Sequence, residues 1–315
     1  VLMTKSAIFA ETAAGRIKPD IIKAFKKLAL PVENFEVFVG VSREEYLQHH
    51  VDIVENPPIE TLELNPDYTF DNFVVGNSNR YLFAASKAVA ENPGNTYNPL
   101  FIYGASGLGK THMMHAIANE IARKYPEKKV LYTTCENFLN EFINSIAQRS
   151  SARFRFHYRN VDVLMIDDVQ FLKARTQLQE ELFHTFNELS AQNKQIVLTS
   201  DKHPQELAIL EDRLRTRFEG GMIADIQPPD PETKIAILKR KAMERKCPVS
   251  DDVLEFLAKD SGHDVRTLEG RLTKVIFASK LHEEPITLDL AKLALSESVN
   301  EVNDDEEVTP DKIVN

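Results

Sequence analysis

One octapeptide constrains the fold of this chain more than any other part of its sequence. Residues 104–111 read Gly-Ala-Ser-Gly-Leu-Gly-Lys-Thr and fit the pattern G-x-x-x-x-G-K-[ST], with an apolar run at 100–103 before them and an amphipathic pattern at 110–124 after them. Glycines let backbone amides converge on a phosphate chain, and the start of a helix adds partial positive charge. A chance match in a strand–helix turn is the alternative, and this context makes it rarer. The segment therefore predicts a nucleoside triphosphate site.

The residues of the loop and of a later strand divide the expected chemistry between them. Lys110 is expected to reach the β- and γ-phosphates, and the Thr111 hydroxyl to bind Mg²⁺. An apolar run at 163–166 ends in Asp167 and Asp168, which predicts two carboxylates at the ligand edge of a parallel sheet. Asp167 would hold the Mg²⁺, and Asp168 could orient or deprotonate the attacking water. An acidic turn is the alternative, and the upstream loop favours the site.

Short apolar runs alternate with helical patterns from about residue 65, at 100–103, 130–133, 161–166, 196–199 and 222–226. This alternation predicts an α/β fold of the P-loop NTPase type, with a five-stranded parallel sheet covered by helices on both faces. After Pro228-Pro229 the pattern becomes helical only, which predicts a small all-α subdomain. We expect an N-terminal segment of unknown role at 1–64, the α/β domain at 65–227, a helical lid at 228–300 and an acidic linker at 301–315.

Two further acidic residues follow predicted strands. Asp201 ends the run that begins at Ile196 and could sense the γ-phosphate; a helix cap before Pro204 is the alternative, almost as well supported. Glu136 follows the second strand and could help to position water, or it could simply favour the start of a helix. The residues alone leave both alternatives open.

Two arginines are candidates for contact with phosphates. Arg217 lies in a segment with arginines at alternate positions, and it could enter a neighbouring subunit's site as an arginine finger or belong to a solvated basic helix end. Arg266 opens the last strongly patterned helix, and it could cross from the lid to the phosphates or pair with Glu269. From the residues alone these alternatives also stay open.

Composition narrows the setting of the protein. The 315 residues carry a formal net charge of -10, which argues against general binding of nucleic acid. However, the last 20 residues hold seven acidic residues and one basic residue, while 148–160 holds four arginines and no acid. Two cysteines and no apolar run of about 18 residues indicate a reducing, cytoplasmic setting without a membrane span. The first residue, Val1, and the abrupt end suggest a fragment of a longer chain.

These motifs, in this order and spacing, resemble the central AAA+ ATPase domain of the bacterial DnaA replication initiators over about residues 65–300. The resemblance rests on motifs far more specific than a phosphate loop alone. The matching stretches are 68–80, 97–104, 109–112, 166–172, 181–187, 199–201, 212–214 with 217–218, and 265–270.

The resemblance implies a role for each matching residue. Asp201 would be the first sensor of the γ-phosphate and Arg266 the second. Arg217 would be the finger acting in trans, with Arg213 at the same subunit interface, and Glu136 would take part in hydrolysis. Asp167 and Asp168 would form the Walker B motif. The nucleotide contacts would come from the linker and the Walker A loop, namely Val75, Gly76, Gly104, Gly107, Leu108, Gly109, Lys110, Thr111 and His112.

The resemblance also gives meaning to the basic stretch. Residues 136–160 correspond to the helical insertion that lines the channel of the family's oligomer and grips single-stranded DNA. Ile143 falls on its apolar position. Gln177 stands where the family has a basic residue, a departure that Lys173 and Arg175 could offset by charge.

The implied function is that of an initiator that binds ATP with Mg²⁺, hydrolyses it slowly, self-assembles with ATP and engages origin DNA, with a replicative helicase or regulators as further partners. The family's C-terminal duplex-reading domain is missing, and residues 308–313 resemble its first turn. A related regulator or helicase loader that naturally lacks that domain is the alternative, and a nucleotide-dependent scaffold without turnover is another. A GTPase is disfavoured because 193–196 lacks the aspartate of the N-K-x-D motif.

Overall fold

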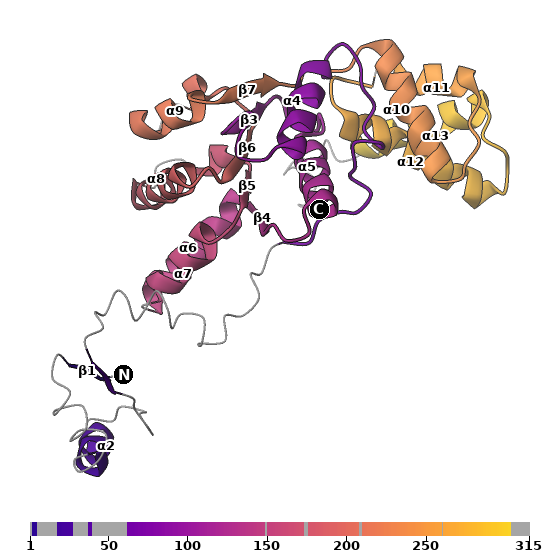
Figure 1. The fold of residues 1–315 in the computed structure, drawn as a ribbon. Coiled ribbons are helices and arrows are strands. Elements are labelled where there is room, and N and C mark those ends of the chain that lie inside the picture. The colour runs from indigo at the N-terminus through magenta and orange to yellow at the C-terminus, as the bar shows by residue number, and fades with distance from the viewer. Residues whose placement is uncertain are drawn as a thin grey trace, which may run out of the picture. The chain divides into compact units, whose positions relative to one another are not determined.

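The computed structural model describes residues 2–4, 18–27, 37–39, 62–148, 150–172, 176–207, 210–259 and 261–303 (Figure 1). The chain separates into two compact units, Val1–Glu60 and Thr61–Asn315. In the first unit, β1 (Leu2–Thr4) pairs in parallel with β2 (Val37–Val39), and residues Lys18–Lys27 form the helix α2.

A five-stranded parallel sheet forms the centre of the second unit. Its order is β4-β5-β6-β3-β7. The phosphate loop follows β3, and β4, the next strand along the chain, lies at the edge of the sheet with β5 and β6 between them. The strands fall on the predicted apolar runs and confirm them. Their bounds are β3 (Leu100–Tyr103), β4 (Val130–Thr134), β5 (Val163–Asp167), β6 (Gln195–Ser200) and β7 (Met222–Asp225).

Helices cover both faces of this sheet, as the alternating pattern predicts (Figure 1). On one face, α4 (Arg80–Glu91) and α5 (Lys110–Lys124) contribute to an extensive apolar cluster. Met113, Met114 and Ile117 of α5 are fully buried there, which is why the chain keeps an amphipathic helix directly after the glycine loop. The other helices of the α/β part are α6 (Cys135–Ala147), α7 (Ser151–Arg159), α8 (Thr176–Ala191) and α9 (Asp212–Glu219), with 3₁₀ turns η1 (Val169–Leu172) and η2 (Pro204–Glu206).

Among the described residues after β7, four helices form a helical subdomain, hereafter the lid. They are α10 (Pro231–Glu244), α11 (Asp251–Ala258), α12 (Val265–His282) and α13 (Leu288–Asn303). They share an apolar core of their own, with Leu238, Leu257, Leu268 and Leu272 almost completely buried. Caps set two of the helix starts: Asp230 accepts a hydrogen bond from Thr233 N, and Asp264 accepts one from Thr267 N. The expected acidic linker beyond 303 lies outside the described residues.

The lid is attached to the α/β part at places close to the glycine loop. Val265 N donates to Gly107 O at 2.9 Å, so the start of α12 is hydrogen-bonded to the loop itself. Gly76 lies against Thr233 of α10, where an added Cβ would come within 2.2 Å of the threonine hydroxyl. Within the described ranges, no helix is both long and apolar enough to cross a membrane.

Candidate nucleotide-binding site

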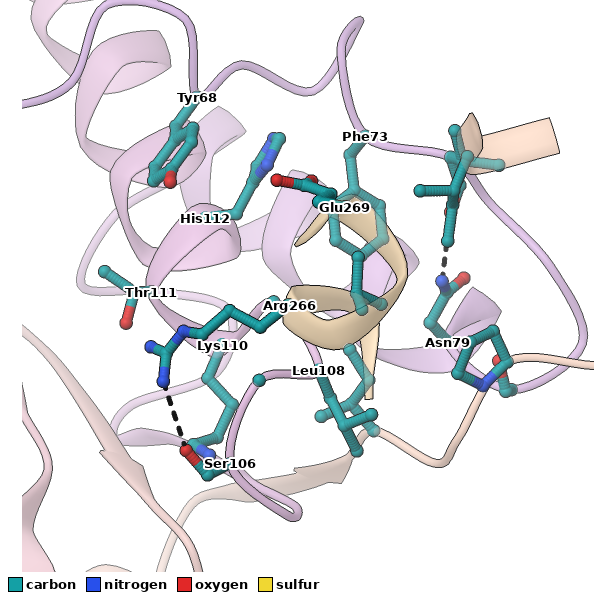
Figure 2. Close-up of a pocket in the computed structure, with 18 of the residues that line it drawn as sticks. Tyr68, Phe73, Asn79, Ser106, Leu108, Lys110, Thr111, His112, Arg266 and Glu269 are labelled. Atoms are coloured by element: carbon teal, nitrogen blue, oxygen red, sulfur yellow. Dashed lines mark hydrogen bonds between the residues drawn. The ribbon is translucent and has the colours of Figure 1, made fainter. Parts of the chain in front are cut away.

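A cavity of about 300 Å³ lies between the sheet's carboxyl edge and the lid (Figure 2). This size lies in the usual range for small-molecule sites. The phosphate loop forms its floor, and helices α10 and α12 contribute side chains from the lid. The lining residues that the argument uses are Tyr68, Phe73, Val74, Asn79, Ser106, Gly107, Leu108, Gly109, Lys110, Thr111, His112, Asp168, Gln170, Asp201, Arg240, Lys241, Arg266 and Glu269.

Two glycines of the loop hold places that a side chain could not occupy. Gly104 has φ +155°, and a Cβ there would lie 2.3 Å from the carbonyl oxygen of Ile226. Gly107 has φ +78°, in the left-handed region that glycine tolerates, and its Cβ would press on Asp264 at 3.1 Å. The loop therefore passes close to both β7 and the lid, and α5 begins directly after it at Lys110.

Lys110 is buried, with 6% of its surface exposed, and its ammonium group is held by the loop and by the neighbouring strand. Its Nζ donates to Gly104 O at 2.7 Å, to Ala105 O at 3.1 Å and to Asp201 Oδ1 at 2.7 Å. Asp201 thus points back at the phosphate loop and does not cap the following turn, where His203 is the capping residue. A cation in this position can bind phosphate oxygens that replace its present acceptors.

The carboxylate of Asp167 ends β5 and is almost fully buried. Its Oδ2 accepts hydrogen bonds from Thr111 Oγ1 at 2.8 Å and from the Tyr132 hydroxyl at 3.2 Å. Its Oδ1 accepts a short hydrogen bond from Thr199 Oγ1. Burial, followed by the nearby Asp167 charge, raises the pKa of Tyr132, so this phenol stays a donor. Hydroxyls from α5, β4 and β6 therefore fix one carboxylate.

Asp168 follows with φ +60°, which is rare outside glycine. Its backbone N–H donates to Thr199 Oγ1 at 2.9 Å, and its Oδ1 accepts from Gln170 Nε2 at 2.9 Å. Burial raises the pKa of the Asp168 carboxyl; the Gln170 hydrogen bond opposes this, and repulsion from Asp167 and Asp201 adds to it. Sequence reasoning assigned no role to Gln170. Its only signal was a polar residue inside the otherwise apolar segment 169–172.

Arg266 reaches the loop from the lid. Its Nη1 lies 3.5 Å from Ser106 Oγ, at the limit of a hydrogen bond, and Figure 2 shows the side chain extended over the loop. Glu269, the alternative partner on the same helix, instead approaches Lys241 of α10 at 3.6 Å. The geometry therefore favours the position over the phosphate loop, and not the alternative pair with Glu269.

Aromatic rings and the linker form the remaining wall of the cavity. The His112 ring stacks on Tyr68, with centroids 4.6 Å apart, and its Nε2 donates to Thr69 O. Burial lowers the pKa of His112, which favours the neutral ring. Val74 lines the cavity, and Asn79 Nδ2 donates to its carbonyl. Val75 and Gly76, the predicted linker contacts, lie next to it in sequence but are not lining residues.

Several predicted residues lie away from this cavity. Glu136 is exposed at the start of α6, and Arg217 is exposed on α9. Arg213, on the same helix, pairs with Glu211 at 2.5 Å and lies over the Phe183 ring at 4.8 Å. Within one chain these groups do not reach the loop. Their expected roles in hydrolysis and at a subunit interface stay predictions.

The predicted DNA-binding insertion corresponds to α6 and α7. Ile143 is 49% exposed on α6, as an apolar contact residue must be. Two of the four arginines are directed elsewhere: Arg155 and Arg159 both pair with Glu181 of α8, at 3.3 and 2.6 Å. Part of the local positive charge is thus neutralised within the fold. Arg149, Lys173 and Arg175 lie outside the described residues.

The residues present fit a nucleotide with a divalent cation. A glycine loop that excludes Cβ atoms can approach a phosphate chain closely, and Lys110 supplies the charge. The Thr111 hydroxyl and the Asp167 carboxylate meet at 2.8 Å, and hard oxygen donors of this kind are the ligands that Mg²⁺ takes in such sites.

Comparison with known proteins places this geometry in one family. The family described as Bacterial DnaA ATPase domain matches residues 64–225. The chromosomal replication initiator protein DnaA of Cutibacterium acnes is 51% identical over 251 residues, which is 80% of this chain and 50% of that protein. The chain therefore spans about half the length of this curated relative.

Solved structures agree. Domain III of the Thermotoga maritima DnaA matches with a TM-score of 0.72 and 43% identity, covering 75% of this chain and 98% of that one. A replication initiator DnaA bound to AMPPCP and single-stranded DNA matches with a TM-score of 0.63 and 40% identity, covering 68% of this chain and 66% of that one. The fold is thus the AAA+ type of P-loop domain, and the chain belongs to the bacterial DnaA ATPase-domain family.

Proposed function

We propose that this chain is the ATP-binding and slowly hydrolysing part of a replication initiator, and that ATP controls its self-assembly at the chromosomal origin. The observation that carries the proposal is the convergence of Lys110, Asp168 and Asp201 in one cavity beneath Arg266 of the lid. Charges of both signs that converge around a glycine loop suit a polyphosphate with its cation. Its membership of the DnaA ATPase-domain family supports the same conclusion.

Each site residue has a defined task in this proposal. Lys110 exchanges its carbonyl acceptors for the β- and γ-phosphates, and Arg266 binds the phosphates from the lid side. Asp168 orients the attacking water, and its raised pKa suits a group that accepts a proton. Thr111 and Asp167 hold Mg²⁺, which neutralises charge on the phosphates when bound.

Assembly would complete the site. Arg217 is exposed and too far along α9 to line its own chain's cavity, so we propose that it enters a neighbouring subunit's site, with Arg213 at the same contact. Such a residue stabilises negative charge that develops on the transferring phosphoryl group. Turnover would then depend on the oligomer, and hydrolysis would weaken it.

Single-stranded DNA is the proposed partner of α6 and its surroundings. The exposed Ile143 supports this, and so does the DnaA relative bound to AMPPCP and single-stranded DNA. Lys173 and Arg175 stay in the proposal as charged contacts, and Glu136 as a residue that assists hydrolysis. A replicative helicase and regulators are proposed as further partners.

The test separates binding, assembly and turnover. Arg217→Ala should keep ATP affinity within about threefold of the unmodified chain and abolish ATP-dependent assembly in light scattering. Arg123→Ala is a matched control, because Arg123 is an exposed arginine on α5 that pairs with Glu120 in the same helix. Full assembly by Arg217→Ala would refute the finger. Equal binding of single-stranded DNA with ATP and with ADP would refute the proposed nucleotide switch. If the unmodified chain releases no more phosphate than Asp168→Asn, the protein is a nucleotide-dependent scaffold without turnover.

A further inference from the structure

A buried glutamine connects Asp168 and Asp201, two of the carboxylates that line the cavity. Gln170 lies in η1, with 8% of its surface exposed. Its Nε2 donates to Asp168 Oδ1 at 2.9 Å and to Asp201 Oδ2 at 3.2 Å, while its Oε1 accepts from Asp201 N at 3.2 Å. An amide group offers two donors and two acceptor sites, so both donors are committed to the carboxylates.

These contacts extend a continuous line across the site. Asp201 directly follows β6 and holds Lys110 through its other oxygen, whereas Asp168 follows the neighbouring strand β5. The line therefore runs from the lysine of the phosphate loop through Asp201 and Gln170 to Asp168. Asp168 and Asp201 carry like charges and repel each other. An amide between them satisfies both without adding charge.

We propose that Gln170 is a positioning residue for hydrolysis: it fixes Asp168 and Asp201 relative to each other, so that the carboxylate that orients water keeps its place when Lys110 turns to phosphate. This inference rests on the proposed ATP hydrolysis. Only a neutral side chain of this length with two N–H groups meets the geometry. Glutamate would place a third carboxylate beside the carboxylates of Asp168 and Asp201, with no N–H to donate to them. Methionine would fill the space without any donor.

The chain provides a matched control in Gln195. This residue is fully buried, and it also makes three hydrogen bonds: Nε2 donates to Tyr97 O and Ile196 O, and Oε1 accepts from Gly94 N at 2.8 Å. It begins β6, at the opposite end of the strand from Asp201. The two glutamines therefore share burial and bonding capacity, and they differ in whether their partners are site carboxylates.

The experiment compares Gln170→Met and Gln195→Met in the full chain, measuring the ATP dissociation constant and the steady-state kcat. Gln170→Met should lower kcat at least tenfold, about 1.4 kcal/mol in barrier, while the ATP dissociation constant stays within threefold. Gln195→Met should keep kcat within twofold. If either variant fails to fold, Gln170→Leu and Gln195→Leu, which remove the same N–H donors without adding a charge, decide by the same kcat criteria.

Each other outcome overturns a distinct statement. An unchanged kcat in the folded Gln170 variants, or an equal loss in the Gln195 variants, would refute the positioning role. An unmodified chain that releases no more phosphate than Lys110→Ala would refute the proposed hydrolysis, and the inference with it. Turnover in the unmodified chain together with normal kcat in Gln170→Met would refute the inference alone.

Discussion

Replacing Thr199 by valine should destabilise the α/β unit by about 2–4 kcal/mol. Thr199 is fully buried on β6, where its hydroxyl donates to Asp167 and accepts from Asp168 N. Valine has the same shape and no hydroxyl, so one carboxylate oxygen loses its donor and one backbone N–H loses its acceptor. Each unsatisfied buried polar group costs about 1–3 kcal/mol. Thr111 and Tyr132 still donate to the other oxygen of Asp167. Because that oxygen keeps its hydrogen bonds, the total loss is limited.

Urea unfolding followed by far-ultraviolet circular dichroism measures this loss. With a slope near 3 kcal/mol/M, the midpoint should fall by roughly 1 M while the slope itself stays constant. Thr199→Ser is the control, because it retains the hydroxyl and loses a methyl group. If Thr199→Val unfolds at the same urea concentration as Thr199→Ser, the hydroxyl contributes no more than packing does, and this account of how Asp167 is fixed is wrong.

Two further predictions concern groups outside the loop. Glu181→Ala should lower the free energy of unfolding by about 2–4 kcal/mol, because it leaves the mostly buried Arg159 with fewer partners. Glu188→Ala removes an exposed carboxylate and should cost less than about 1 kcal/mol in the same urea denaturation assay. Equal losses in the two variants would contradict this prediction. Burial lowers the pKa of His115, whose Nδ1 accepts from Asn65 N and must be unprotonated to do so. Below pH ~6.5 the unfolded chain therefore binds a proton that the native state resists, and stability should fall with decreasing pH by up to about 1.4 kcal/mol per unit for this residue. In His115→Gln, the urea midpoint should change less with pH between pH 6.5 and 5 than it does in the unmodified chain. If the midpoint depends on pH as strongly in the variant, His115 does not cause the pH dependence.

The sequence predicted those parts of the molecule that depend on local pattern. Apolar runs gave the five strands because a parallel sheet covered on both faces needs side chains without polar groups. The glycine loop and Asp167 were predictable because their chemistry requires particular residue types at a fixed spacing. Asp201 was ambiguous, and its contact with Lys110 depends on β3 and β6 lying side by side, which no local pattern encodes.

The contacts that fix the site were not predictable for the same reason. Tyr132 and Thr199 reach Asp167 because β4, β5 and β6 are neighbours in register, with Thr134 opposite Asp167 and Leu198 opposite Ile166. The charge of the basic stretch was also misleading in part. Arg159 pairs with Glu181 across two packed helices, 22 residues apart in sequence, and a local count of charges does not include that acid.

The hydrogen bond from Val265 N to Gly107 O has a mechanical consequence. The covalent connection after β7 would by itself act as a hinge, about which four helices could turn freely. The hydrogen bond between main-chain atoms is a further attachment and restricts this rotation. A displacement of Gly107 should therefore also move the first turn of α12. Because no side chain takes part in this bond, substitutions along α12 can change the side chains that face the cavity without breaking the connection to the loop.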